Sequence, residues 1–242
     1  MKLIYYIMKR KIILVIAIIL LAALAYGAYY VNDYYHADDR AQGYMNGTDD
    51  VSVIKTDKGL FLDGPGNDSA LIFYPGAKVE YTSYLPLLCE ISGNGTDCFL
   101  VEMPFNLALL DKNAADDIIN QYDYSHYFIA GHSLGGAMAS DYVNETNNTD
   151  GLILLASYST KEIGKPVLSI YGSQDRVLNA EKYNESIPFI NENLTEVMID
   201  GANHAQIGSY GSQSGDGIAK ISPEKEQDRI TEEIINFISQ FN

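Results

Sequence analysis

Basic side chains are scarce in this chain. Its 242 residues include 16 Lys or Arg against 32 Asp or Glu, a formal net charge of −16 at pH 7. Four of the bases, Lys2 and residues 9–11, precede the first acidic residue, Asp33, so the balance from residue 32 onward is −20. A segment this acidic repels nucleic acids and anionic membrane surfaces, and we expect neither as a partner. Acidity of this kind keeps an exported domain soluble.

Cysteine is equally rare. Cys89 and Cys98 are the only two, and they flank a Gly-Asn-Gly sequence. Neither their spacing nor their context suggests a metal site, and we expect no metal and no other cofactor. In an oxidising compartment the two thiols can form a disulfide between the end of a helix and the next strand. Two buried free thiols are the alternative.

The longest uncharged run lies near the amino terminus, over residues 12–31. Twenty nearly continuous apolar residues can cross a bilayer as a helix. The basic residues 9–11 precede the run, and tyrosines gather at its far end, as the positive-inside rule and the aromatic belt require. We therefore predict a cytoplasmic segment (1–11), an uncleaved transmembrane anchor (12–31) and a juxtamembrane spacer (32–50), with the remaining chain outside the cell membrane.

Two alternatives to the anchor remain. Residues 23–25 (Ala-Leu-Ala) have the small-x-small form of a signal-peptidase site, and cleavage there gives a secreted protein. A buried core helix fits less well, because the run is apolar on all sides and has a basic flank. Export is supported by an excess of Asn-x-Ser/Thr sequons, typical of a glycoprotein, although Asn-rich loops also generate unused sequons. The sequons begin at Asn46, Asn67, Asn94, Asn144, Asn147, Asn184 and Asn193.

Residues 51–242 predict a single α/β domain. A hairpin over residues 51–62 opens it, and short apolar runs then alternate with helical segments. Strands are expected at 70–74, 98–103, 127–130, 152–156, 166–171 and 196–199. Helices are expected at 79–90, 111–122, from the turn that follows the third strand to about 145, at 180–186, and from the N-cap Ser222 to about 238. Continuous apolar strands separated by helices are typical of a mostly parallel sheet covered on both faces.

A strand, a tight turn and a helix meet in residues 127–139, which read YFIAGHSLGGAMA. Ser133 is at the apex, between Gly131 and Gly135 of a G-x-S-x-G motif. A serine on such a turn has a strained backbone, so the residues two before and two after it must be small. The turn exposes the hydroxyl and directs the following N–H groups at an oxyanion. The motif alone is common, but its placement between a buried strand and a helix predicts a nucleophile rather than a structural serine.

A serine hydroxyl needs a base to activate it and a third group to orient that base. Of the four histidines, His204 alone lies in a late loop, after the last expected strand. Asp175 follows the preceding strand, and Glu102 is the rival acid. The carboxyl ends of parallel strands share one edge of a sheet, where ligands bind. The order Ser133, Asp175, His204 is that of one hydrolase architecture. A turn aspartate and an ordinary loop histidine are the alternatives.

From about residue 51 to 242 the sequence resembles the α/β-hydrolase fold proteins of the compact serine-hydrolase kind. Three segments carry the resemblance: 131–136 (GHSLGG), 172–177 (GSQDRV) and 201–204 (GANH). The resemblance implies that Ser133 is the nucleophile and that His204 acts as general base and then as general acid. It also implies that Asp175 fixes the tautomer of His204 and stabilises its cation.

The resemblance further implies an oxyanion hole made of the backbone N–H groups of Leu134 and Ala77. Ala77 lies in Pro-Gly-Ala (75–77), where relatives often have His-Gly-x. The missing histidine is a departure from the family pattern, and Lys78 is the alternative for this second donor.

The space above the site is expected to be open. Relatives that bind lipids often insert a lid after the strand that here ends at 156, but only residues 157–165 separate it from the next strand. This is too short for a cap domain. The Gly/Ser-rich stretch 206–217 is long for a connector, and it either folds over the pocket or forms a flexible surface loop.

The sequence thus predicts an exported, membrane-anchored serine hydrolase that cleaves a small-molecule ester or related acyl bond through an acyl-enzyme. Acyl transfer to another acceptor uses the same residues and is one alternative. A non-catalytic cell-surface protein that retains the fold is the other.

Overall fold

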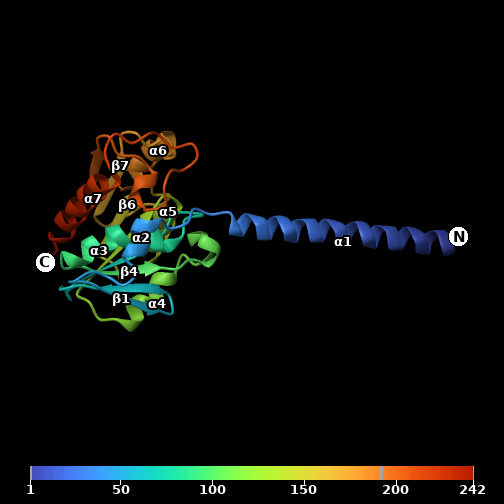
Figure 1. Ribbon diagram of the computed structural model, residues 1–242, viewed down its shortest axis with the longest axis horizontal. Helices are drawn as coiled ribbons and strands as arrows, with labels where there is room; N and C mark the ends of the chain where they lie inside the picture. The colour runs from blue at the N-terminus through green and yellow to red at the C-terminus, as the bar shows by residue number, and fades with distance from the viewer. Residues whose placement is uncertain (1, 191–192, 242) are drawn as a thin grey trace. The chain divides into compact units, whose positions relative to one another are not determined.

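A computed structural model describes residues 2–190 and 193–241 of the chain (Figure 1). The chain divides into two compact units, with the boundary between Tyr34 and Tyr35. The second unit contains one eight-stranded sheet in the order β1-β2-β4-β3-β5-β6-β7-β8. Its strands are β1 (Ser52–Thr56), β2 (Gly59–Asp63), β3 (Ser69–Tyr74), β4 (Asp97–Val101), β5 (His126–His132), β6 (Gly151–Leu155), β7 (Val167–Gly172) and β8 (Leu194–Ile199).

The sheet is mostly parallel. The hairpin strands β1 and β2 pair antiparallel, and β2 also pairs antiparallel with β4. Every pair from β4 through β3 to β8 is parallel. The strands β3 to β8 therefore end on one side, which we call the carboxyl edge, and begin on the other, the amino edge. The predicted fold class is confirmed.

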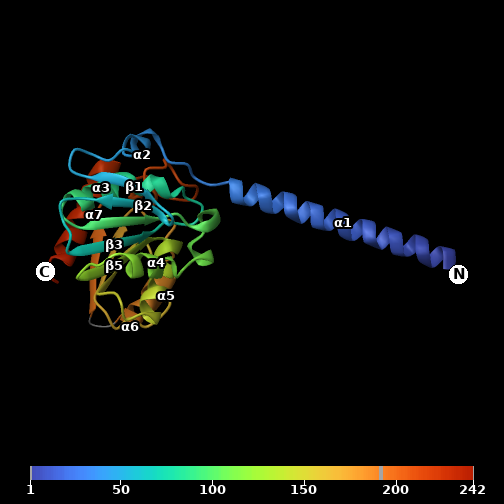
Figure 2. The same cartoon turned by 90° about the horizontal axis from the view of Figure 1, so that it is seen from below.

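Helices cover both faces of the sheet. They are α2 (Asp39–Gly43), α3 (Leu85–Gly93), α4 (Ala114–Gln121), α5 (Leu134–Glu145), α6 (Ala180–Ile190) and α7 (Pro223–Ile238). Figure 2 shows α3 and α7 on one side of the sheet and α4 and α5 on the other. In β3, Leu71 and Phe73 join the core beneath α3 and α7, whereas Ile72 and Tyr74 join the core beneath α4 and α5. Burial on both faces explains why the strands are continuous apolar runs.

The helix expected over residues 79–90 begins later than the sequence suggested. A 3-10 turn occupies Tyr81–Tyr84, and α3 starts at Leu85. Pro86 lacks an N–H and tolerates only the first turn of a helix, so α3 cannot extend through it from residue 79.

The spacer is expected over residues 32–50, but residues 35–50 belong to the second unit. The Tyr35 N–H donates to the Lys78 carbonyl at 2.8 Å, and the Glu80 N–H donates to the Tyr35 carbonyl at 2.8 Å. The short helix α2 lies in this segment, and Arg40 Nη1 donates to Gln227 Oε1 of α7 at 2.6 Å. The compact domain therefore includes this segment.

The two cysteines are free and buried, so the expected disulfide is not formed. Cys98 Sγ instead lies 3.3 Å from the Thr96 carbonyl oxygen, to which it donates. Burial raises the pKa of Cys89 to about 12 and holds that of Cys98 well above its ordinary value. Both side chains belong to the core beneath α3 and α7, where a thiol acts as a small apolar group.

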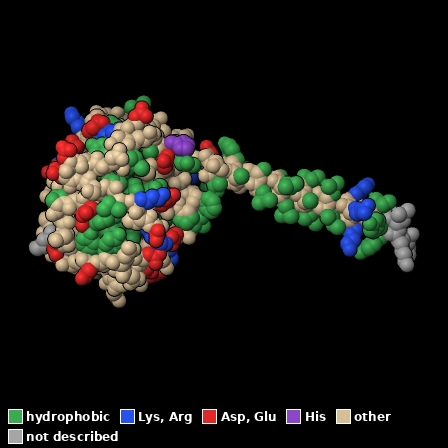
Figure 3. Space-filling view, turned by 60° about the horizontal axis from the view of Figure 1, so that its bottom comes forward, with side chains coloured by type: hydrophobic (Ala, Val, Ile, Leu, Met, Phe, Trp, Pro, Cys, Tyr) green, Lys and Arg blue, Asp and Glu red, His purple; other side chains and the backbone are tan. Residues whose placement is uncertain are grey.

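The first unit consists of helix α1 (Lys2–Asn32). Over Tyr5–Asn32 it is long and apolar enough to cross a membrane. Figure 3 shows apolar side chains along this helix and basic ones near its amino-terminal end. These properties are compatible with an anchor, and a signal sequence shares them.

Candidate active site

Backbone strain is concentrated at the carboxyl edge. Within the described residues, five side-chain-bearing residues have a positive φ: Lys78, Phe105, Asn106, Ser133 and Ala156. Each follows the end of β3, β4, β5 or β6 within five residues. Such conformations cost of order 1–3 kcal/mol each and cluster at functional sites. The strain therefore favours this edge as the place of the chemistry.

Ser133 forms a sharp turn between β5 and α5, with φ 52° and ψ −121°. A Cβ atom on Gly131 would lie 2.4 Å from the carbonyl carbon of Gly135, and one on Gly135 would lie 2.1 Å from the Tyr74 carbonyl oxygen. Both glycines of the motif are thus required by close backbone approach. The Ser157 hydroxyl holds the turn by donating to the Ser133 carbonyl at 2.7 Å.

His204 and Asp175 form a buried pair at the same edge. The distance from His204 Nδ1 to Asp175 Oδ2 is 2.9 Å, and the side chains are 1% and 2% exposed. Asp175 Oδ1 accepts from the backbone N–H groups of Val177 and Leu178, each at 2.8 Å. Because the carboxylate can only accept, Nδ1 of His204 carries the proton and Nε2 keeps its lone pair.

A cavity of about 220 Å³ contains both Ser133 and His204. Its other lining residues are mostly apolar: Leu134, Ala137, Ala156, Tyr158, Val177, Leu178 and Asn179. His204 Nε2 is buried and has no hydrogen-bond partner within the described chain. Catalytic hydrogen bonds are often long without substrate. Ser133 and His204 thus line one small cavity.

Glu102, the rival acid, lies elsewhere. It is exposed and close to Tyr81, whose pKa is raised to about 12 by burial and then by Glu102. The carboxylate beside His204 is that of Asp175.

The loop after β3 has one backbone N–H, that of Ala77, without a hydrogen-bond partner within the described chain. The Gly76 N–H donates to the Tyr84 hydroxyl at 3.1 Å, and the Lys78 N–H donates to the Asn106 carbonyl at 2.9 Å. No hydrogen bond to the Ala77 N–H is present within the described chain. Leu134 is the first residue of α5, so its N–H also has no intrahelical partner. Ala77 and Leu134 remain the two predicted donors, and Lys78 is already engaged.

Sequence reasoning missed a contact between Tyr84 and His132, the residue before the serine. The Tyr84 hydroxyl lies 2.7 Å from His132 Nδ1, the only acceptor to which it can donate among the described residues. His132 is therefore protonated on Nε2. Burial, and next the charge of His204, hold the pKa of His132 well below its ordinary value. Its ring lies against that of His204, with centroids 4.5 Å apart, so His204 has a neutral neighbour.

The backbone around His204 is held from two sides. The Asn203 N–H donates to Glu226 Oε2 of α7 at 3.0 Å, and the Ala205 N–H donates to Asp216 Oδ2 at 2.9 Å. Burial raises the pKa of Glu226 to about 8. Nothing in the sequence assigns this role to Glu226, because the contact joins residues 23 apart in different elements.

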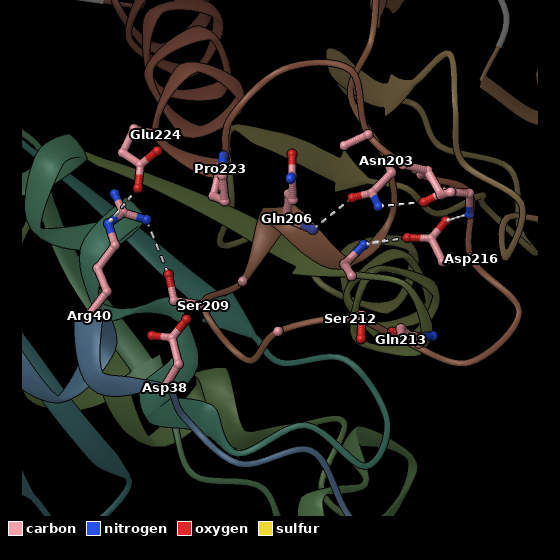
Figure 4. Close-up of a pocket in the computed structure, with 16 residues that line it drawn as sticks. Asp38, Arg40, Asn203, Gln206, Ser209, Ser212, Gln213, Asp216, Pro223 and Glu224 are labelled. Carbon is pink, nitrogen blue, oxygen red and sulfur yellow. Dashed lines mark hydrogen bonds and ion pairs between the residues drawn. The ribbon is translucent and has the colours of Figure 1, made fainter.

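The stretch 206–217 does not cover the Ser133 cavity, since none of its residues lines that cavity. It lines instead a second cavity of about 540 Å³, together with residues near α2 and the start of α7 (Figure 4). Asp216 comes from this stretch and supports the loop of His204. The stretch therefore positions the histidine loop rather than closing the site.

Comparison with known proteins agrees with this fold. Comparison with curated proteins finds none that matches. Among solved structures, the chain is similar to a predicted CIB-like hydrolase from Thermoplasma acidophilum, with a TM-score of 0.50 and 17% identity over 77% of this chain and 97% of that one. At this identity the similarity shows the fold alone. Residues 70–228 match the alpha/beta hydrolase family, and because this is more than half of the chain, the protein belongs to that family.

Proposed function

We propose that the protein is a serine hydrolase that cleaves a carboxylic ester or related acyl bond through an acyl-enzyme. One observation carries the proposal. His204, whose Nδ1 is paired with Asp175 and whose Nε2 has no partner within the described chain, lines the same cavity as Ser133, the strained residue of the turn between β5 and α5. Membership of the α/β hydrolase family supports hydrolase chemistry in general.

The proposed reaction begins when Ser133 Oγ attacks the acyl carbon and His204 Nε2 takes the hydroxyl proton. Asp175 stabilises the imidazolium that forms, and its two backbone hydrogen bonds keep the carboxylate in place. The N–H groups of Leu134 and Ala77 stabilise the oxyanion. His204 then returns the proton to the leaving alcohol, and a water molecule repeats the sequence to release the acid.

We also propose that α1 anchors the domain outside the cell membrane. The helix is uncharged over residues 12–31, and this run follows the basic residues 9–11, as in a signal anchor. All seven sequon asparagines are exposed, as glycosylation requires. Mass spectrometry of the amino terminus of membrane-extracted protein distinguishes the intact anchor from a chain cleaved after residue 25.

The test uses the full chain and two measurements, labelling by a fluorophosphonate and turnover of 4-nitrophenyl butyrate. Ser133→Ala is expected to remove labelling and to lower turnover by at least about 10³-fold. Ser52→Ala, at an exposed serine of β1, is the control and retains both activities. Equal turnover by Ser133→Ala and the unaltered protein would refute the proposal. Product analysis with added alcohol separates hydrolysis from acyl transfer.

A further inference from the structure

Three large apolar side chains are exposed in the loop after β4, which we call the apolar loop (residues 103–111). Phe105 and Leu109 are each 63% exposed, and Leu110 is 54% exposed. The other exposed large apolar residues of the second unit stand singly in sequence: Met45, Ile54, Phe189, Met198 and Ile218. Scattered apolar residues are normal on a protein surface, but a cluster of them marks an interaction site.

The backbone holds Phe105 in this exposed position. Phe105 and Asn106 have φ values of 53° and 55°, the left-handed region that such residues rarely adopt. Hydrogen bonds fix the strained turn: the Asn106 N–H donates to the Met103 carbonyl at 3.0 Å, and the Asn106 carbonyl accepts from Lys78 at 2.9 Å. The apolar loop is therefore a fixed feature, and it is bonded to the residue that follows Ala77 at the site.

The second unit begins beside residues 78–80, the segment to which the apolar loop is hydrogen-bonded. Tyr35, its first residue, is hydrogen-bonded to Lys78 and Glu80. Only two residues separate Tyr35 from Asn32, the last residue of α1. Three residue steps span at most about 11 Å. If α1 crosses a bilayer, the covalent chain alone therefore keeps residues 78–80 near the membrane surface.

We propose that the apolar loop inserts Phe105, Leu109 and Leu110 into the surface of the bilayer that anchors the chain, and that the enzyme takes its ester substrates from that bilayer. This rests on the hydrolase function and the anchor proposed above. The bilayer is the occupant that the chain itself brings within reach of the loop. Phe and Leu side chains are of the kind that penetrate the headgroup boundary. The cavity of about 220 Å³ that Ser133 lines is on the same carboxyl edge of the sheet as the apolar loop, and this is the cavity that an ester from the membrane would enter.

The absence of tryptophan from the chain gives a direct test. In full-length protein reconstituted into phosphatidylcholine vesicles, Phe105→Trp introduces a single tryptophan, in the apolar loop, whose emission can be excited apart from that of the tyrosines. Lipids brominated on their acyl chains are expected to quench its emission by roughly half or more. Phe189→Trp is the matched control, because Phe189 is also exposed but lies just before β8, at the amino edge. Its emission is expected to be unaffected.

Two results would overturn the proposal. Equal quenching of the two variants would mean that the apolar loop has no special access to lipid. Emission from Phe105→Trp that is shifted to the blue but not quenched by brominated lipid would place the loop against protein, such as a second copy of the chain.

The substrate class is tested with two esters that share one acyl group. Hexadecyl butyrate remains in the vesicles, whereas 4-nitrophenyl butyrate reaches the site from water. The double variant Leu109→Ser/Leu110→Ser is expected to lose about tenfold in turnover of the hexadecyl ester and to stay within about twofold on the other. Phe189→Ser is expected to change neither rate.

The outcomes separate the two proposals. If the unaltered protein hydrolyses neither ester while lipid quenches Phe105→Trp, the hydrolase function fails and the membrane contact stands. If both esters are hydrolysed and the double variant affects them equally, the hydrolase function stands and the membrane-resident substrate is wrong.

Discussion

The sheet carries a His–Asp pair at each of its two edges. His204 and Asp175 follow β8 and β7 at the carboxyl edge, whereas His126 is the first residue of β5 and Asp150 directly precedes β6 at the amino edge. The distance from Nδ1 to Oδ2 is 2.9 Å in the first pair and 3.5 Å in the second. The side chains are 1% and 2% exposed in the first pair, but 26% and 38% exposed in the second.

The difference separates the pair that we propose to be catalytic from a second pair of the same residue types. The pair at the amino edge is partly exposed and makes no hydrogen bond between His126 Nδ1 and Asp150, and partly exposed ion pairs contribute little. Asp150 Oδ2 instead accepts from the Tyr127 N–H at 2.9 Å, which joins the start of β5 to the segment before β6. Asp175 has two backbone donors behind it and His204 in front of it. Of the two pairs, only that of His204 and Asp175 has a member, His204, that lines a cavity together with a strained serine.

Among the substitutions that test the difference between the two pairs, Asp175→Asn is expected to have the largest effect. An amide cannot hold His204 in the tautomer with a free Nε2, so kcat for 4-nitrophenyl butyrate should fall by about 10³–10⁴-fold. Asn Oδ1 can still accept from Val177 and Leu178, so the thermal unfolding temperature should change little. A loss below tenfold would show that Asp175 does not orient the base.

Glu226→Gln tests the support behind His204 through the pH dependence of stability. Burial raises the pKa of Glu226 in the folded chain from 4.5 to about 8. The folded state therefore binds this proton more tightly than the unfolded state does. The contribution of proton binding to the free energy of unfolding is full below about pH 4.5 and is lost as the pH rises to about 8. Glutamine is neutral throughout and can still accept from Asn203.

Denaturant unfolding at pH 5 and pH 9 measures this effect. The quantity compared is the free energy of unfolding of Glu226→Gln minus that of the unaltered protein. This difference should be larger at pH 9 than at pH 5 by on the order of a few kcal/mol. The same difference at both pH values would mean that Glu226 does not change protonation in this range.

Tyr84→Phe is expected to have an intermediate effect on catalysis. It removes the hydroxyl that accepts from Gly76 and donates to His132, so two buried polar groups lose their partner. Both the Ala77 loop and the ring beside His204 lose a fixed orientation. We expect kcat to fall about tenfold with KM within about twofold, because these contacts act on the transition state.

Tyr127→Phe is the matched control at the amino edge. The Tyr127 hydroxyl is partly buried and donates to the Tyr122 carbonyl. Its removal should lower the unfolding temperature and leave kcat unchanged. An equal fall in kcat for the two variants would mean that Tyr84 acts through stability alone.

The sequence predicted the features that depend on neighbouring residues or on the strand pattern, but not contacts such as that of Tyr84 with His132. The sharp turn at Ser133 could be predicted because the strand, the glycines and the helix that form it are consecutive in the chain. Asp175 and His204 follow from the rule that parallel strands end on one edge, which requires only the strand pattern. Tyr84 and His132 are 48 residues apart, and their contact depends on how the 3-10 turn before α3 packs against the end of β5. The apolar residues of the 103–111 loop are ordinary in sequence, and only their exposure distinguishes them.

The smallest expected effect is that of Asp150→Asn, and it decides whether the two edges are independent. The Asn carbonyl can still accept from the Tyr127 N–H, and the lost interaction with His126 is a partly exposed one, so stability should fall by about 1 kcal/mol or less. Because β5 separates His126 from the elbow by its whole length, kcat should stay within about twofold of the unaltered protein. Steady-state turnover of 4-nitrophenyl butyrate measures this. A tenfold loss would mean that β5 transmits a change at its start to Ser133, and the division into a structural pair and a catalytic pair would then be wrong.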